Sequence, residues 1–117
     1  MQKATILLAL LATLSFISQE PTLKGKWNYA GGKFNNKLSP APKDYIQQRQ
    51  YSDKSFDAWA YSKGEKDLKY ESGDYSLQGD TCLETQTFCY QDQSMIGKTV
   101  HYHYVLRNDT LILNGTF

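Results

Sequence analysis

The chain has 117 residues, with 13 Lys and Arg against 12 Asp and Glu and a formal net charge of +1. This balance excludes the dense basic block with which proteins bind nucleic-acid backbones, so no nucleic-acid partner is expected. The length suits a single domain, and the aromatic share of 14% favours β structure.

The N-terminal residues have the pattern of a signal peptide. Lys3 supplies a positive charge, and residues 4–17 form an apolar run interrupted only by Thr5, Thr13 and Ser15. Such a run is shorter than the ~20 residues that a transmembrane helix needs. We therefore expect residues 1–18 to be removed on export, leaving residues 19–117 as a secreted or periplasmic domain with no membrane partner. A membrane anchor or a buried N-terminal helix is the alternative, and the polar sequence that follows disfavours both.

After Pro21 the chain predicts an all-β domain of short antiparallel strands. This part is rich in Tyr, Thr, Trp and Phe, turn residues recur at short intervals, and no window keeps a helical period. The predicted strands are residues 25–30, 44–51, 55–61, 68–77, 81–88, 98–107 and 110–113. A long loop, with at most one helical turn, is predicted for residues 33–43, which contain Pro40 and Pro42.

Three short turns join neighbouring strands of this prediction. They lie at residues 52–54, at residues 78–80 and at Asn108-Asp109. Sequential pairing predicts a meander, which either closes into a barrel or folds into a sandwich, since an open sheet would leave long unpaired edges. We expect an antiparallel, up-and-down β-barrel.

The C-terminal residues carry a hairpin signal. Asn114-Gly115 favours a tight turn, but only Thr116 and Phe117 follow it. We interpret this as a shortened domain whose barrel is incomplete at its last strand. A frayed strand end is the alternative.

Several segments, in order, resemble a known family. Gly25-Lys26-Trp27 resembles the Gly-x-Trp element of lipocalins, and residues 49–61, 73–84, 96–98 and 108–111 are similar to the lipocalin-like domains of small secreted bacterial proteins of unknown function. The resemblance implies that Gly25 and Trp27 close one end of the barrel. The arginine that pairs with this tryptophan in lipocalins has two candidates here, Arg49 and Arg107.

Cys82 and Cys89 are the only cysteines. An even count in an oxidising compartment predicts a disulfide between them. Their spacing differs from the Cys-x-x-Cys of oxidoreductases, and two cysteines alone cannot complete a structural zinc site.

His101-Tyr102-His103 is the most suggestive group for metal binding, because alternate strand residues share a face. The same alternation places both histidines opposite the apolar face formed by Val100, Tyr102 and Tyr104. No third ligand lies nearby, so we expect exposed or cross-strand histidines and no metal.

The other polar residues predict no enzyme and no cofactor. The carboxylates mostly fall at turns, and neither a nucleophile elbow nor a phosphate-binding glycine loop is present. Glu84 is the partial exception, because it would matter chemically if its side chain pointed inward.

Five strand aromatics are the candidate ligand-binding residues: Trp59, Tyr61, Tyr75, Tyr102 and Tyr104. In a small barrel such residues either fill the interior or line a cavity. We expect non-catalytic binding of a small apolar or aromatic ligand. The alternative is an interaction module that pairs through an open edge strand, with a partner or with a second copy of the chain.

Overall fold

The structure is a computed structural model that describes residues 22–116, so the predicted signal peptide, residues 1–18, lies outside the described residues. Nine strands and one short helix make up this part of the chain. They are β1 (Gly25–Asn28), β2 (Gly31–Phe34), β3 (Lys37–Pro40), β4 (Tyr45–Tyr51), β5 (Ser55–Ser62), β6 (Leu68–Gln78), β7 (Thr81–Cys89), the 3-10 helix η1 (Gln93–Met95), β8 (Thr99–Arg107) and β9 (Thr110–Thr116). Within residues 22–116, no helix has the length and apolar character needed to cross a membrane.

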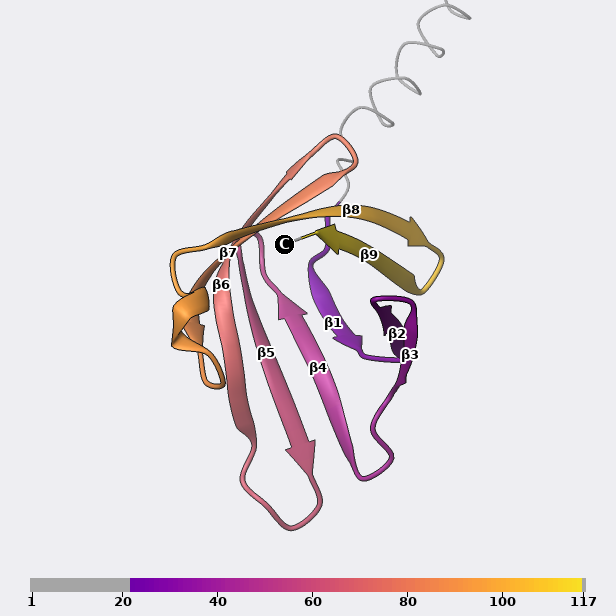
Figure 1. Cartoon of the computed structure of the whole chain (residues 1–117), viewed down its shortest axis with the longest axis vertical. Helices are drawn as coiled ribbons and strands as arrows, with labels where there is room; N and C mark the ends of the chain where they lie inside the picture. Colours follow the sequence, from indigo (N-terminus) through magenta and orange to yellow (C-terminus); the bar gives the residue numbers. More distant parts are fainter. Residues whose placement is uncertain (1–21, 117) are drawn as a thin grey trace, which may run out of the picture.

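Seven of the strands form one antiparallel sheet, in the order β1-β4-β5-β6-β7-β8-β9. The sheet curls into a nearly closed barrel, with one unsealed seam between its terminal strands, β1 and β9 (Figure 1). The prediction of an all-β antiparallel barrel is therefore confirmed. From β4 to β9 each strand pairs with the next along the chain, as a meander requires.

The three predicted turns join the strands that they were expected to join. In the β4–β5 turn, Ser52 N donates to Ser55 O at 2.9 Å. Gly79 lies in the β6–β7 turn with φ +61°, and Asn108 lies in the β8–β9 turn with φ 51°. Positive φ is the reason that Gly and Asn serve as reliable turn signals.

The predicted loop at residues 33–43 is wrong in its first part. Strands β2 and β3 form a separate two-stranded sheet there, with Phe34 opposite Lys37. Asn35 and Asn36, at φ 49° and 65°, form its two-residue turn, and asparagine tolerates this left-handed conformation better than most residues. Pro40 ends β3, so the prolines terminate the hairpin rather than preventing it.

The predicted hairpin turn at Asn114-Gly115 is also wrong. Both residues lie within β9, where Asn114 pairs with His103 and Gly115 with Tyr102. A Cβ on Gly115 would lie 2.6 Å from Tyr102 Cε1, so this glycine makes room for a tyrosine ring. The Asn-Gly dipeptide reflects a close contact between strands rather than a turn.

The predicted disulfide is absent, because Cys82 and Cys89 are both free thiols. They lie near opposite ends of β7, and an extended strand separates Cα atoms seven positions apart by about 23 Å. A disulfide requires Cα atoms within about 7 Å. The even cysteine count in an expected oxidising compartment favoured the pair, but seven positions along one extended strand keep the two sulfurs apart.

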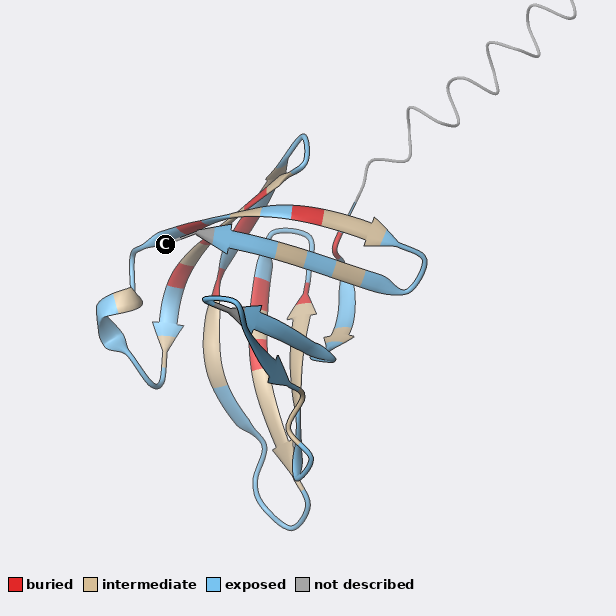
Figure 2. Ribbon diagram, turned by 45° about the vertical axis from the view of Figure 1, so that its right-hand side comes forward, coloured by how far each residue is buried: buried red, intermediate tan, exposed pale blue. Residues whose placement is uncertain are grey.

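The core lies between the inner faces of the barrel strands. Its buried members are Leu23, Tyr51, Phe56, Tyr75, Cys82 and Tyr104. Gly73 lets β6 lie close to Phe56 and to β7, since a Cβ there would lie 2.8 Å from Phe56 Cε1 and 2.1 Å from Thr85 O. Figure 2 shows the buried residues gathered where β8 and β9 cross the other strands, while the lower ends of β4, β5 and β6 are half-buried or exposed.

Candidate functional site

Strands β4, β6 and β7 bring a polar cluster to the inner face of the barrel. We call it the Arg49 cluster and define it by Arg49 and Tyr51 on β4, Glu71 on β6, and Glu84 and Gln86 on β7. Strand alternation places these residues on one side, because Arg49 faces Ala58, Ala58 faces Glu71, and Gly73 faces Gln86 across the ladders.

Hydrogen bonds link every member of the Arg49 cluster. Arg49 donates to Glu84 through Nη2 and to Glu71 Oε1 through Nη1 at 3.3 Å. Tyr51 O–H donates to Glu84 Oε2 at 2.6 Å, and Gln86 Nε2 donates to Glu71 Oε1 at 2.8 Å. The two carboxylates therefore share one guanidinium, which is the geometry of charge-assisted pairing.

The charge states follow from burial and from these contacts. Burial raises the pKa of Glu84, while the guanidinium of Arg49 opposes that rise. Burial alone would lower the pKa of Arg49, but Glu84 and the other negative neighbours outweigh it and raise this pKa, so Arg49 stays charged. Burial also raises the pKa of Tyr51, whose phenol stays neutral and donates.

Apolar groups flank the Arg49 cluster on its closed side. The guanidinium carbon lies 4.5 Å from the ring centroid of Phe56, within cation–π range. The thiol of Cys82 lies 3.9 Å from Glu84 Oε2, and burial raises its pKa to about 12, so it remains protonated. This side of the cluster is packed core.

The opposite side of the cluster reaches solvent. The side chains of Arg49 and Glu71 are 23% and 21% exposed, whereas that of Glu84 is fully buried. Gln86 Oε1 is buried and, among residues 22–116, has no hydrogen-bond partner. A buried acceptor without a partner is unfavourable unless water or a ligand donates to it. The cluster can therefore accept a hydrogen bond from a molecule at the inner face.

Three of the five candidate aromatics lie on the inner face. Tyr75 O–H donates to Ser52 O at 2.5 Å and Tyr104 O–H donates to Gly79 O at 2.9 Å, so both phenols tie strands to turns. Tyr102 is half-buried against the core, and burial raises its pKa to about 12. These residues fill the closed half of the barrel.

The other two candidate aromatics, Trp59 and Tyr61, lie on the outer face. They alternate with Ala58 and Ala60, and Ala58 faces Arg49 across the β4–β5 ladder. Their rings stack with centroids 6.2 Å apart and an interplanar angle of 13°. The structure thus separates the five predicted residues into an inner group and an outer pair.

Trp27 is half-buried on β1 and packs against the core, and its Nε1 donates to Leu23 O at 2.8 Å. Gly25 pairs with Tyr51, and Trp27 pairs with Arg49, on the neighbouring strand β4. Arg107 ends β8 as an exposed residue. Of the two arginine candidates, Arg49 is therefore the one beside Trp27, and closure of the barrel by Gly25 and Trp27 stays a prediction.

His101 and His103 lie exposed on β8, as strand alternation predicted. His103 Nε2 lies 3.2 Å from Asp80 Oδ2. Within the described part of the chain, no three His, Cys, Asp or Glu side chains group closely enough to hold a metal ion.

Sequence reasoning missed the Arg49 cluster as a unit. The available signal was the period-two spacing of Arg49 and Tyr51 on one strand and of Cys82, Glu84 and Gln86 on another. Such a pattern of polar residues on a strand usually marks a solvent face, so its inward direction was not evident.

In comparisons with known proteins, no family model and no curated protein matches the chain.

Proposed function

We propose that this chain is an exported, lipocalin-like, non-catalytic protein that binds a small amphipathic ligand at the inner face of β4, β5, β6 and β7. The observation that carries the proposal is the unpartnered, buried Gln86 Oε1 beside the partly exposed Arg49 and Glu71. An O–H or N–H group of a ligand would satisfy this acceptor.

Two large, partly exposed apolar side chains lie beside the Arg49 cluster on the inner face. Tyr45 shares the inner face of β4 with Arg49, and Leu68 faces Ala60 on the same side of the sheet. Both are unusually open for large inward-facing residues, at 39% and 42% exposure. An aromatic or aliphatic ligand body would cover them, so the favoured ligand combines an apolar body with one hydrogen-bond donor.

The test uses N-phenyl-1-naphthylamine, an apolar aromatic probe with one N–H group whose fluorescence rises in apolar surroundings. We expect saturable binding, weakened by Leu68→Ser and by Gln86→Met. Ile112→Ser is the matched control, because Ile112 is 40% exposed on the outer face of β9. Absence of saturable binding, or equal loss in all three variants, would contradict the proposal.

A second candidate function is strand pairing at the open seam, with a second copy of the chain. Within residues 22–116, β1 and β9 each pair on one side only. Strand β9 contains no charged residue and no proline, the usual features that protect an exposed edge. Two copies of β9 could pair antiparallel without repulsion between like charges.

Sedimentation velocity over a range of concentrations tests this candidate. Pairing through β9 predicts a concentration-dependent dimer that Ile112→Lys abolishes, because a charge is then placed on the shared edge. A monomer at all concentrations, or a dimer that persists in Ile112→Lys, would argue against pairing at this edge.

A further inference from the structure

The outer face of β1, β4 and β5 carries an ordered set of polar and aromatic side chains that the inner-face proposal does not use. Two rows cross this face. Lys26, Gln50 and Asp57 form one row through their ladder pairing, and Asn28, Gln48 and Trp59 form the next. We call these six residues, together with Tyr61, the outer face site.

Hydrogen bonds hold the amides of the outer face site in place. Gln48 Nε2 donates to Asn28 Oδ1 at 2.8 Å. Gln50 Nε2 donates both to Gln48 Oε1 at 2.9 Å and to the Tyr61 hydroxyl at 3.0 Å. Side chains fixed in this way lose little conformational entropy when they bind a ligand.

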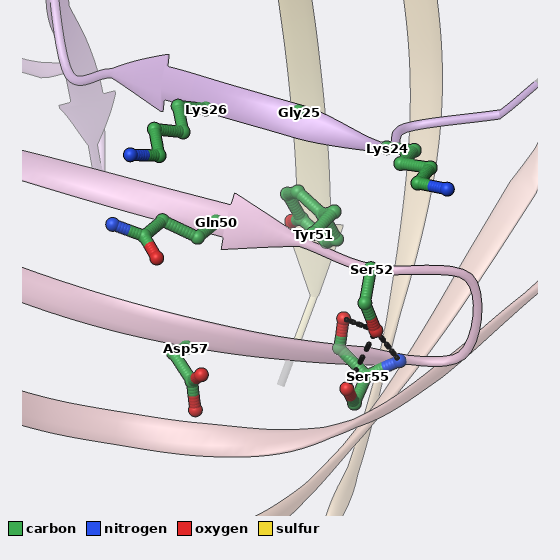
Figure 3. A pocket seen from close by; sticks show the side chains of 8 residues that line it. All are labelled: Lys24, Gly25, Lys26, Gln50, Tyr51, Ser52, Ser55 and Asp57. Atoms are coloured by element: carbon green, nitrogen blue, oxygen red, sulfur yellow. Dashed lines mark hydrogen bonds between the residues drawn. The ribbon is translucent and has the colours of Figure 1, made fainter.

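An open cleft of about 320 Å³ adjoins these residues. Figure 3 shows Lys26, Gln50 and Asp57 on three neighbouring strands along it. Ser72 O–H donates to Asp57 Oδ1 at 2.6 Å, which orients that carboxylate. Among residues 22–116, neither Gln50 Oε1 nor Asp57 Oδ2 accepts a side-chain hydrogen bond. The cleft therefore offers an ammonium donor and two acceptor oxygens.

The aromatic pair completes the site beside the cleft. The rings of Trp59 and Tyr61 are nearly parallel, and Gln50 connects the cleft to Tyr61. Lys69 Nζ lies 5.8 Å from the Trp59 ring centroid, on the strand that follows. Near-parallel aromatic rings suit a ligand with a flat, weakly polar C–H face, and the neighbouring amides suit hydroxyl groups.

We propose that the outer face site binds a neutral oligosaccharide. One sugar ring would stack on the Trp59–Tyr61 pair, and the next would place its hydroxyls against Gln50, Asp57 and Lys26. Each hydroxyl both donates and accepts, which matches the mixed donors and acceptors of the cleft. Lys26 and Asp57 lie in the same row of the outer face site, so their opposite charges leave no strong excess of one charge that would favour an ionic ligand.

The test is an NMR titration of the whole protein with cellohexaose and, separately, with chitohexaose. The chain has two tryptophans, so the indole N–H signal of Trp27 serves as an internal control for that of Trp59. We expect at least one sugar to shift the Trp59 indole and Gln50 side-chain amide signals in a saturable way while the Trp27 signal stays fixed. No saturable shift with either sugar, or equal shifts of both indoles, would overturn the proposal.

A matched pair of variants on β4 provides the second measurement. Gln50→Met should weaken binding about tenfold or more, because the cleft loses its central amide. Gln47 lies on the same strand but on the inner face, so Gln47→Met should leave the affinity for the sugar unchanged. Equal affinity in wild type and Gln50→Met would overturn the assignment. Both faces can be tested independently, since binding of N-phenyl-1-naphthylamine should not respond to Gln50→Met.

Discussion

Glu84 has no exposed surface, yet it lies among the guanidinium of Arg49, the phenol of Tyr51 and the thiol of Cys82. Burying a carboxylate is costly unless charged and hydrogen-bonding partners offset the loss of water. Arg49 supplies the charge, and Tyr51 supplies a neutral donor. Removing Glu84 would leave both partners without their main acceptor at the centre of the barrel.

Glu84 predicts a specific dependence of stability on pH. Because burial raises its pKa, the folded protein holds this proton at pH values where the unfolded chain, with a carboxyl pKa of about 4.3, has released it. The contribution of Glu84 to the free energy of unfolding is therefore fully present below about pH 4 and falls as the pH rises. Urea unfolding of wild type and Glu84→Gln between acid and neutral pH measures it. Parallel pH profiles of the two proteins would contradict this account.

The contacts of Glu84 also predict how far the free energy of unfolding falls when its carboxylate is removed. Among residues 22–116, Glu84→Leu leaves the guanidinium of Arg49 with Glu71 as its one carboxylate partner and Tyr51 without its acceptor. Breaking a buried ion pair in this way costs about 3 to 5 kcal/mol. Denaturant unfolding at neutral pH should show this loss, and a change below about 1 kcal/mol would mean that the pair contributes little.

At the scale of elements, the seven strands of the main sheet were predictable because alternation and turn residues agree along most of the chain. The turns at Gly79 and Asn108 need positive φ, so their residue types are informative. Hairpin β2–β3 was missed because its Asn35-Asn36 turn is followed closely by prolines. Asn114-Gly115 wrongly predicted a turn. Its glycine instead leaves space for the ring of Tyr102 on β8, and this contact forms only when β8 and β9 pair.

The candidate site was less predictable than the strands, for a physical reason. Alternation assigns Trp59 and Tyr61 to one face and Ala58 to the other, but only closure of the barrel decides which face is inside. The register shift between Ser72 and Gly73 also changes which residues of β6 and β7 share a side. Both effects arise from tertiary pairing, so the joint position of Arg49, Glu71 and Glu84 could not be inferred from local patterns.

The positions of the two cysteines along β7 predict that thiol reductants do not change the stability of the fold. Cys82 and Cys89 lie near its two ends and are unbonded. Titration of the denatured, unreduced protein should find two free thiols per chain, and adding a reductant should leave the melting temperature unchanged. An absence of free thiols would require a bond that this strand geometry forbids. Alkylation of Cys89 alone in the folded state is expected, since Cys82 is buried and its raised pKa keeps the thiol protonated.

At the scale of the whole molecule, backbone ladders join all neighbouring strands of the barrel except at the seam, where, among residues 22–116, β1 and β9 do not pair. Strand β1 has four residues and, within the described part of the chain, pairs only with β4. Beside the seam, Leu23 is fully buried, and Trp27 packs on the same core cluster that contains Tyr51 and Tyr104. Leu111 and Leu113 of β9 reach that cluster from the other side of the seam. The two edges are therefore joined through shared core contacts rather than through backbone hydrogen bonds.

This arrangement makes Trp27 one of the residues that attach β1 to the core beside the seam. Trp27→Ala would remove its packing against the core and its hydrogen bond to Leu23 O, leaving β1 with the β4 ladder as its main attachment. Large core truncations cost about 3 to 5 kcal/mol, and because Trp27 is only half-buried we expect the lower part of that range. Against a total stability of about 5 to 15 kcal/mol, this loss should lower the urea midpoint clearly without abolishing folding. Tyr90→Ala is the control, since Tyr90 is 63% exposed and its truncation should change the free energy of unfolding by no more than about 0.5 kcal/mol. If both variants unfold at the wild-type midpoint, the core contacts of Trp27 do not hold the seam, and the role in barrel closure that the Gly25-Lys26-Trp27 resemblance implies would have to be abandoned.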